Sequence, residues 1–347
     1  PALLIEGKNN VILDGFDISN VLFWSEIIDG YNNVIRNCSF AIARDTGTRS
    51  GLKIIRGGNN KILNNSFDDG NDELLIENSN RNLIEGNRFT KARHVLLNIS
   101  CGNHNVVRKN YFSNVLQKAA EEFDCEGVIS SSYHGDRQIR KYHATKHNLW
   151  EKNTFAFTKD NRDRHGPYNG IQYAGQNGLV RRNLFYNTQG GGVDLTQYTS
   201  EANHCYAARI FHNVFYNNTG GGIVTSNSRA SATSFWDNRM VNNILYKNLP
   251  MPLKWADNRP GGSQATNRSA ASGGFRFENN NILGQAPGEE TVIYLGRASR
   301  MSLKTAEARY SEYYTGNVEL DPGFEDAANR DFRLRAGSRM IDRGAFL

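Results

Sequence analysis

Long apolar runs are absent from this 347-residue chain, and its N-terminus lacks the succession of a positive segment, an apolar segment and a cleavage site. Neither a membrane span nor a secretory signal is therefore visible in the sequence. The four cysteines show no C-x-x-C spacing, which argues against a zinc or iron–sulfur site. A leucine-repeat consensus and a sustained helical heptad are also missing, which disfavours a leucine-rich horseshoe and a coiled coil.

Positively charged residues outnumber negatively charged ones. Lys and Arg number 41 against 35 Asp and Glu, which gives a net charge of +6 at pH 7. This balance favours a polyanionic partner, either a nucleic acid or an acidic polysaccharide. The sequence offers no aromatic platform on which single-stranded bases would stack. We therefore expect an acidic polysaccharide as partner, with no nucleic acid and no membrane insertion.

A short phrase, Asn-x-Phe, recurs along the chain. The copies begin at Asn65, Asn87, Asn110, Asn153, Asn183 and Asn213. Successive Phe residues are separated by 22, 23, 43, 30 and 30 positions, and short β-type segments with Asn or Gly turns lie between them. Units of this length built from several short strands are typical of a β-solenoid. Stacked coils would place the Asn side chains in one hydrogen-bonded column and the Phe side chains in another.

These coils and the ending DPGFEDAANRDFRLRAGSRMIDRGAF resemble the right-handed parallel β-helix proteins of the pectin-lyase-like superfamily. The resemblance implies an all-β fold of ten to eleven coils in a single domain, residues 1–347, with a C-terminal capping segment at 321–347. Because Pro1 lies inside a β-like phrase, we expect an N-terminal cap to be missing from the given sequence. Cys101 and Cys125 would pair across neighbouring coils or remain buried thiols. The superfamily includes lyases, hydrolases, tailspikes and adhesins, which implies a secreted, periplasmic or cell-surface protein.

One sheet of the solenoid can be traced from the strand that follows each link. Alternation predicts inward side chains for Leu52, Leu74, Val95, Val128, Ile171, Val193, Ile223 and Leu253. It predicts outward side chains for Lys53, Leu75, Leu96, Ile129, Gln172, Asp194, Val224 and Lys254. Long connections at 113–127, 133–147 and 156–170 belong to neighbouring coils, so we expect them to wall a groove over the outward face.

Two of these loops are rich in groups suited to β-elimination. That reaction needs a cation on the substrate carboxylate, a base for the C5 proton and an acid for the leaving oxygen. By resemblance to the class, we predict Lys141 or His143 as base, Arg164 as carboxylate clamp and His165 or Tyr168 as acid. The predicted substrate-binding residues are Arg137, Arg140, Gln172, Asp194, Tyr198 and Lys254.

Three alternatives stay open. Asp124 and Glu126 are candidate Ca²⁺ ligands, because carboxylate oxygens suit that ion. A glycoside hydrolase would pair Asp194 with a second carboxylate across the sugar bond. A tailspike or adhesin would need the solenoid and no catalysis. The sequence favours a polysaccharide lyase acting on a uronic-acid-containing substrate, with a glycoside hydrolase as the second hypothesis.

Overall fold

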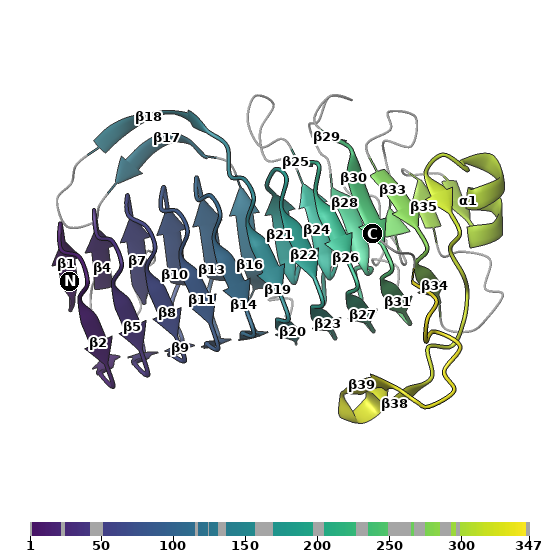
Figure 1. Ribbon diagram of the computed structural model, residues 1–347, viewed down its shortest axis with the longest axis horizontal. Helices are drawn as coiled ribbons and strands as arrows, with labels where there is room; N and C mark the ends of the chain where they lie inside the picture. The colour runs from purple at the N-terminus through teal and green to yellow at the C-terminus, as the bar shows by residue number, and fades with distance from the viewer. Residues whose placement is uncertain are drawn as a thin grey trace.

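Three short strands per coil build the molecule, as the computed structural model in Figure 1 shows. It describes residues 2–21, 25–41, 51–114, 117–123, 125–130, 137–156, 169–196, 205–226, 235–248, 265–266, 275–284, 293–295 and 299–344. Within these, side chains are not described at 125–130, 137–143, 225–226, 235, 265–266, 294–295 and 299–300. Equivalent strands of successive coils pair in parallel and form three long sheets, which we name A, B and C. The predicted parallel β-helix is confirmed.

Sheet A comprises 12 strands, all parallel except the last pair. They are β1 (Leu4–Glu6), β4 (Ser25–Ile28), β7 (Leu52–Ile55), β10 (Asp72–Glu77), β13 (Val95–Ser100), β16 (Lys118–Phe123), β21 (Ile171–Ala174), β24 (Val193–Thr196), β28 (Ile223–Ser226), β32 (Ala265–Thr266), β35 (Ile293–Leu295) and β36 (Ser299–Met301).

Sheets B and C comprise 11 and 10 strands. Sheet B contains β2 (Ile12–Asp14), β5 (Val34–Arg36), β8 (Lys61–Leu63), β11 (Leu83–Glu85), β14 (Val106–Arg108), β19 (Leu149–Glu151), β22 (Leu179–Arg181), β26 (Arg209–Phe211), β30 (Asn238–Val241), β33 (Phe275–Glu278) and β37 (Tyr314–Thr315). Sheet C contains β3 (Asp17–Ser19), β6 (Ser39–Ala41), β9 (Ser66–Asp68), β12 (Arg88–Thr90), β15 (Tyr111–Ser113), β20 (Thr154–Ala156), β23 (Leu184–Tyr186), β27 (Val214–Tyr216), β31 (Ile244–Tyr246) and β34 (Asn281–Leu283).

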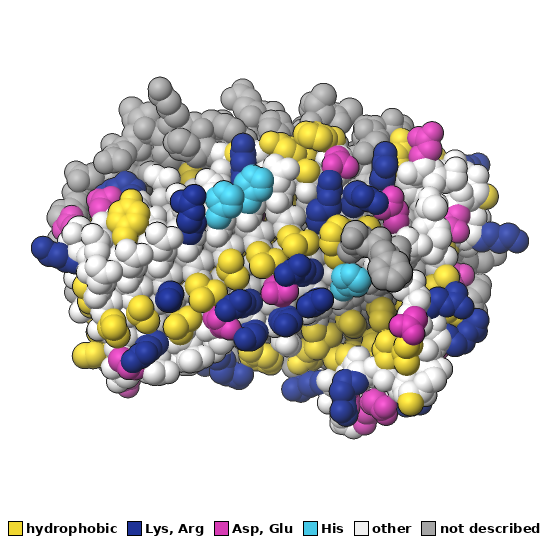
Figure 2. Space-filling model, in the orientation of Figure 1, with side chains coloured by type: hydrophobic (Ala, Val, Ile, Leu, Met, Phe, Trp, Pro, Cys, Tyr) yellow, Lys and Arg dark blue, Asp and Glu magenta, His cyan; other side chains and the backbone are white. Residues whose placement is uncertain are grey.

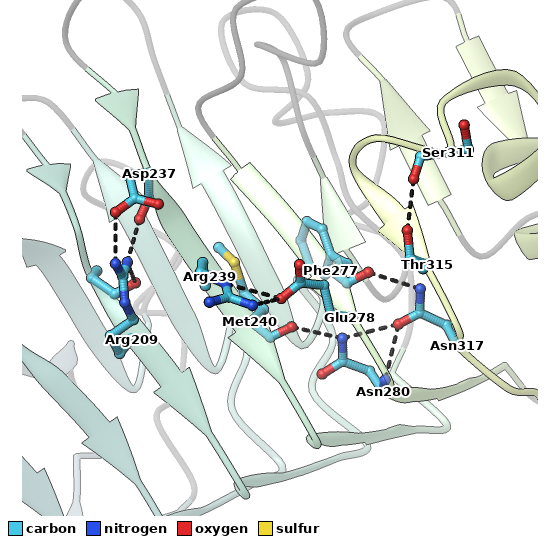
Figure 3. Close-up of polar contacts among 11 residues, drawn as sticks. Arg209, Asp237, Arg239, Met240, Phe277, Glu278, Asn280, Ser311, Thr315 and Asn317 are labelled. Carbon is cyan, nitrogen blue, oxygen red and sulfur yellow. Dashed lines mark hydrogen bonds and ion pairs between the residues drawn. The ribbon is translucent and has the colours of Figure 1, made fainter. Parts of the chain in front are cut away.

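The Asn-x-Phe phrase lies at the turn from sheet B into sheet C. Each Asn there accepts, through Oδ1, the backbone N–H of the Asn one coil earlier, at 2.8–3.0 Å from Asn65 to Asn317. Figure 3 shows the end of this column, where Asn280 contacts Asn317. A buried turn would otherwise leave these backbone groups without partners, so the column stabilises every coil. The predicted Asn column is confirmed.

The Phe residues of the phrase form the predicted second column. From Phe40 to Phe215, successive rings stack with centroids 4.6–4.9 Å apart and planes within 8° of parallel. All are buried in the main core, together with the inward Ile, Leu and Val of sheets A and B. The ring spacing equals the strand spacing, because each coil contributes one ring at the same position.

One predicted strand of sheet A is wrong. Val128 and Ile129 belong to β17 (Cys125–Ser130), which pairs antiparallel with β18 (Arg137–His143) as a hairpin outside the sheet. The sheet strand of that coil is β16, with the charged sequence KAAEEF. Its inward Glu122 is tolerated in the core because Trp150 Nε1 and Asn148 Nδ2 donate hydrogen bonds to it, at 2.5 and 3.0 Å.

The predicted connections change accordingly. The link from β15 to β16 covers only residues 114–117, not 113–127, and the hairpin replaces the predicted 133–147 loop. In Figure 1 the hairpin rises from the end of β16 and extends back toward the N-terminal coils. The sheet strand next to β28 is β32, which takes the place predicted for the segment starting at Leu253. Segment 253–257 lies outside the described residues.

The register of β13 also differs from the prediction. Leu74 pairs with Leu97, not with Val95, and Val95 pairs with Asp72 at the start of β10. Leu96 packs in the main core and does not point outward.

The C-terminal part closes the core and covers one face of sheet C. Helix α1 (Leu303–Arg309) buries Leu303 and Ala306 against the core. The segment predicted as a cap forms β38 (Phe324–Asp326), the 3-10 turn Ala327–Asn329 and β39 (Asp331–Leu334). Its Phe332 packs against the rings of Tyr186 and Tyr216 on sheet C, with ring centroids 5.6 and 5.2 Å apart.

No helix in the described parts of the chain is long and apolar enough to cross a membrane. Two further short strands, β25 (Cys205–Tyr206) and β29 (Phe235–Trp236), pair with each other beside sheet B.

Candidate functional site

The outward face of sheet A carries a row of mostly polar side chains in register. Pairing aligns Glu26, Lys53, Leu75, Asn98, Glu121, Gln172, Asp194 and Val224 on successive strands. The predicted outward orientation of Lys53, Leu75, Gln172, Asp194 and Val224 therefore fits the observed register. Asn98, Glu121, Gln172 and Asp194 are 1–8% exposed. Polar groups as buried as these require partners, and Asn98, Glu121 and Gln172 are connected through Lys118 into one network.

Lys118 is the centre of that network. It forms an ion pair with Glu121, three residues further along β16. Its Nζ also donates a hydrogen bond to Oε1 of Gln172 on β21, at 3.0 Å. Asn98 on β13 donates to Oε1 of Glu121 at 2.7 Å. Side chains from three neighbouring strands are thereby held in fixed positions on one face.

Asp194 is held at the next strand of the same face. Asn169 Nδ2 donates to Asp194 Oδ2 at 2.8 Å, and the backbone N–H of Gly191 donates to Asn169 Oδ1 at 2.7 Å. Asp194 and Glu121 share one register row, with Gln172 between them. Because neighbouring strands lie about 4.8 Å apart, the Cα atoms of the two acidic residues are roughly 10 Å apart.

A histidine–carboxylate pair borders the network at the entry to sheet A. The turn before β13 stacks on the same turn one coil earlier, where the backbone N–H of His94 donates to Asn71 O at 2.9 Å. This places His94 Nδ1 2.7 Å from Asp72 Oδ1. A carboxylate only accepts hydrogen bonds, so Nδ1 carries the proton and Nε2 is left to exchange one. The His94 side chain is 41% exposed, so its ring is accessible to a substrate.

The surroundings of His94 shift its acidity. Burial lowers the pKa of His94, but the hydrogen bond to Asp72 and the negative charges of Asp72 and Glu121 outweigh burial and the opposing charge of Lys118. The pKa of His94 therefore lies above 6.5. A group that titrates near the working pH is suited to general acid–base catalysis.

The residues predicted from sequence fall into three groups. Gln172 and Asp194 lie in the polar row. Arg137, Arg140, Lys141 and His143 lie on β18 and Glu126 on β17, but their side chains are not among those described. The remaining predicted residues lie outside the described residues, namely Asp124, Arg164, His165, Tyr168, Tyr198 and Lys254.

Sequence reasoning missed His94, Lys118 and Glu121. Lys118 and Glu121 were hidden because their strand was taken for a link. The residues Lys91–Ala92–Arg93–His94 had suggested only a positive link. The pairing of His94 with Asp72 depends on the stacking of two coils. The signal for it in the sequence is that the links DDGND and KARH are equivalent in successive coils, which places an acidic and a basic group side by side.

No group of three or more His, Cys, Asp or Glu side chains in the described regions is arranged to hold a metal ion. The acidic run that precedes β10 is engaged within the fold. Glu73 accepts from the backbone N–H of Gly70, and burial raises the pKa of Glu73 well above its ordinary value, as do Asp68, Asp69 and Asp72. The predicted ligands Asp124 and Glu126 lie where no side chain is described.

Comparison with known proteins identifies the fold. Residues 1–155 match the family model described as a right-handed beta helix region. With the three parallel sheets, this match confirms the predicted right-handed parallel β-helix fold. No curated protein sequence matches the chain.

Several solved structures are similar at low identity. A DFA-IIIase from Arthrobacter chlorophenolicus is 12% identical, with a TM-score of 0.40, 67% of this chain covered and 51% of that chain. An exopolygalacturonase from Thermotoga maritima is 14% identical, with a TM-score of 0.41 and coverages of 64% and 53%. An alginate lyase from a Paenibacillus strain is 10% identical, with a TM-score of 0.48 and coverages of 84% and 98%. This chain thus spans about half the length of the first two, and no activity follows from these similarities.

Proposed function

We propose that this protein is a carbohydrate-active enzyme that cleaves a polysaccharide on the outward face of sheet A, across β13 to β24. The observation that carries the proposal is an exposed His–Asp pair beside the buried network of Lys118, Glu121 and Gln172, close enough for the charges of Glu121 and Lys118 to act on the His94 ring. Outward sheet positions have no role in the core, so a connected set of ionisable groups there is best explained by chemistry. Side chains held on a rigid scaffold are common sites of catalysis.

The reaction we propose is β-elimination on an acidic polysaccharide. Nε2 of His94 removes the C5 proton, the C4–O bond breaks as the C4–C5 double bond forms, and the leaving oxygen takes a proton. The substrate carboxylate requires a fixed cation, and the hairpin after β16 contains Arg137 and Arg140. Lys141 and His143 on β18 remain candidate bases, Arg164 a candidate clamp, and His165 and Tyr168 candidate acids. The net charge of +6 supports an acidic substrate.

Hydrolysis is the second candidate, and one observation favours it. Glu121 and Asp194 occupy one register row two strands apart. Their backbone separation of roughly 10 Å suits two carboxylates that flank a sugar bond with room for a water molecule, as in inverting glycoside hydrolases.

We also propose a secreted, periplasmic or cell-surface location. Cys101 is disulfide-bonded, whereas Cys38 and Cys205 are free and buried. Disulfides persist in oxidising compartments, which are also where polysaccharide substrates occur.

The test is to incubate the protein with polygalacturonate, alginate, chondroitin, hyaluronan and a neutral glucan, and to follow two signals. β-Elimination should produce the ultraviolet absorbance of an unsaturated uronate together with new reducing ends. Reducing ends without that absorbance would reject β-elimination and establish hydrolysis. Neither signal on any of the five polymers would contradict the enzymatic proposal and favour a glycan-binding protein.

A further inference from the structure

The turn from sheet B to sheet C requires a residue in the left-handed conformation in every coil. Most coils use the residues that adopt it most readily. These are Gly15, Asn37, Asn64 and Gly86 in the early coils, and Asn242, Asn279 and Gly316 in the late ones, all with positive φ. A residue with a longer side chain adopts this conformation less readily than Gly or Asn.

Four consecutive coils in the middle of the solenoid depart from this pattern. They place Lys109, Lys152, Arg182 and His212 at the turn, with φ between 55° and 56°. All four side chains are exposed, so core packing does not explain the choice. The turn requires the left-handed conformation but not a basic residue, so basic residues at these four positions are an indication of function.

A second line of basic residues lies along the other border of sheet B. The turns from sheet A to sheet B contain Arg81, His104 and His147, which are also exposed and have φ of 57–58°. The rings of His104 and His147 stack with their centroids 4.9 Å apart. Between the two borders runs a row of half-buried apolar side chains in register, Leu83, Val106, Leu149 and Leu179. We call the two borders and this row the basic strip, and Figure 2 shows cationic, histidine and hydrophobic side chains gathered on this side of the middle coils.

The basic strip has unbalanced positive charge. Glu85 pairs with Arg108 and Lys109, each at 2.8 Å, and Glu151 pairs with Arg181 at 2.8 Å. Arg81, Lys152 and Arg182 form no ion pair with any residue the structure describes.

In the next coils, by contrast, two arginines of sheet B are paired. Arg209 pairs with Asp237 at 2.6 Å, and Arg239 pairs with Glu278 (Figure 3). Lys152 and Arg182 form no ion pair with any described residue, although their coils place them in the left-handed turn.

We propose that the basic strip binds an acidic polysaccharide chain, separately from the face of sheet A. The coil repeat of about 4.8 Å presents cations at regular intervals, as the repeated anions of such a polymer require. The apolar row contacts the C–H faces of the sugar rings, and Lys152 and Arg182 bind the anionic groups. This binding surface does not depend on the proposed reaction, because no residue of the strip belongs to the catalytic network.

The test replaces Lys152 and Arg182 together by Asn, the residue that the same turn uses in other coils. Both changes are made in a chain that also carries His94→Gln and Asp194→Asn, so that neither proposed reaction degrades the polymer in the gel. In affinity electrophoresis through gels containing polygalacturonate or alginate at low salt, the parent chain should be retarded, and the double variant should bind about 5- to 30-fold more weakly. Retardation should disappear in about 0.5 M salt.

A matched control replaces Lys91 and Lys247, which also have positive φ but lie outside the strip, by Asn. This control changes the net charge equally and should bind like the parent. The Lys152/Arg182 variant should unfold at the same or a higher temperature, because Asn suits the left-handed turn. Unchanged binding in this variant, or equal loss in the control, would overturn the proposal. Equal retardation by neutral dextran, or binding only to phosphatidylserine vesicles, would also overturn it.

Discussion

Replacing Phe185 by Ala should lower the free energy of unfolding by about 3–5 kcal/mol. Phe185 is fully buried, and its ring stacks between Phe155 and Phe215 with centroid separations of 4.6 and 4.8 Å. Alanine would leave a cavity between two rings whose positions are fixed by their own coils, so the column could not close around it. Chemical denaturation followed by circular dichroism measures the change.

The control for this variant is Phe16→Ala, because Phe16 is 54% exposed. That change should alter the free energy of unfolding by less than about 0.5 kcal/mol. A loss below about 1 kcal/mol for Phe185→Ala would contradict the view that the Phe column holds the solenoid together. In a solenoid each coil contacts only its neighbours, so the damaged coil should also divide the unfolding transition into two steps.

Replacing His94 by Gln should lower kcat by about 100- to 10,000-fold, the usual contribution of a general acid–base group. Gln has a similar size and polarity but cannot exchange the proton. The measurement is the initial rate on the polymer that the wild-type protein cleaves best. The Asp14→Asn variant, which alters an exposed carboxyl far along the chain that bonds Arg36 and Asn37, should retain wild-type activity.

The pH profile separates catalysis by His94 from a structural effect. The neutral ring is the base, so activity should rise as pH increases through the pKa of His94, which lies above 6.5. Asp72→Asn removes the hydrogen bond and the charge that raise this pKa, so the acidic limb should move to lower pH. A His94→Gln enzyme with full activity, or an unchanged limb in Asp72→Asn, would show that another group is the base.

The fold can be predicted from the sequence, because the repeat combines an Asn and a Phe that both find partners only when successive coils stack. Asn at a buried turn and Phe two positions later appear in six coils with little variation. Asp194 and Gln172 were placed on the correct face by alternation alone, since side chains in a strand alternate.

The site was less predictable, for physical reasons. Strand β16 carries three charged residues in KAAEEF, and neither the burial of Glu122 beside Trp150 nor the pairing of Lys118 with Glu121 can be recognised without its neighbours. His94 acquires its partner from the previous coil, 22 positions away. The cations of the basic strip lie one per coil, so they form no cluster in the sequence.

We propose that a polysaccharide chain is bound and cleaved on the outward face of sheet A. The test is a crystal structure of the His94→Gln variant with a bound oligosaccharide of the cleaved polymer. The sugar should lie across β13, β16, β21 and β24, with one ring within hydrogen-bonding distance of the side chain at position 94. An oligosaccharide bound only elsewhere on the molecule, with the face of sheet A unoccupied, would contradict the claim.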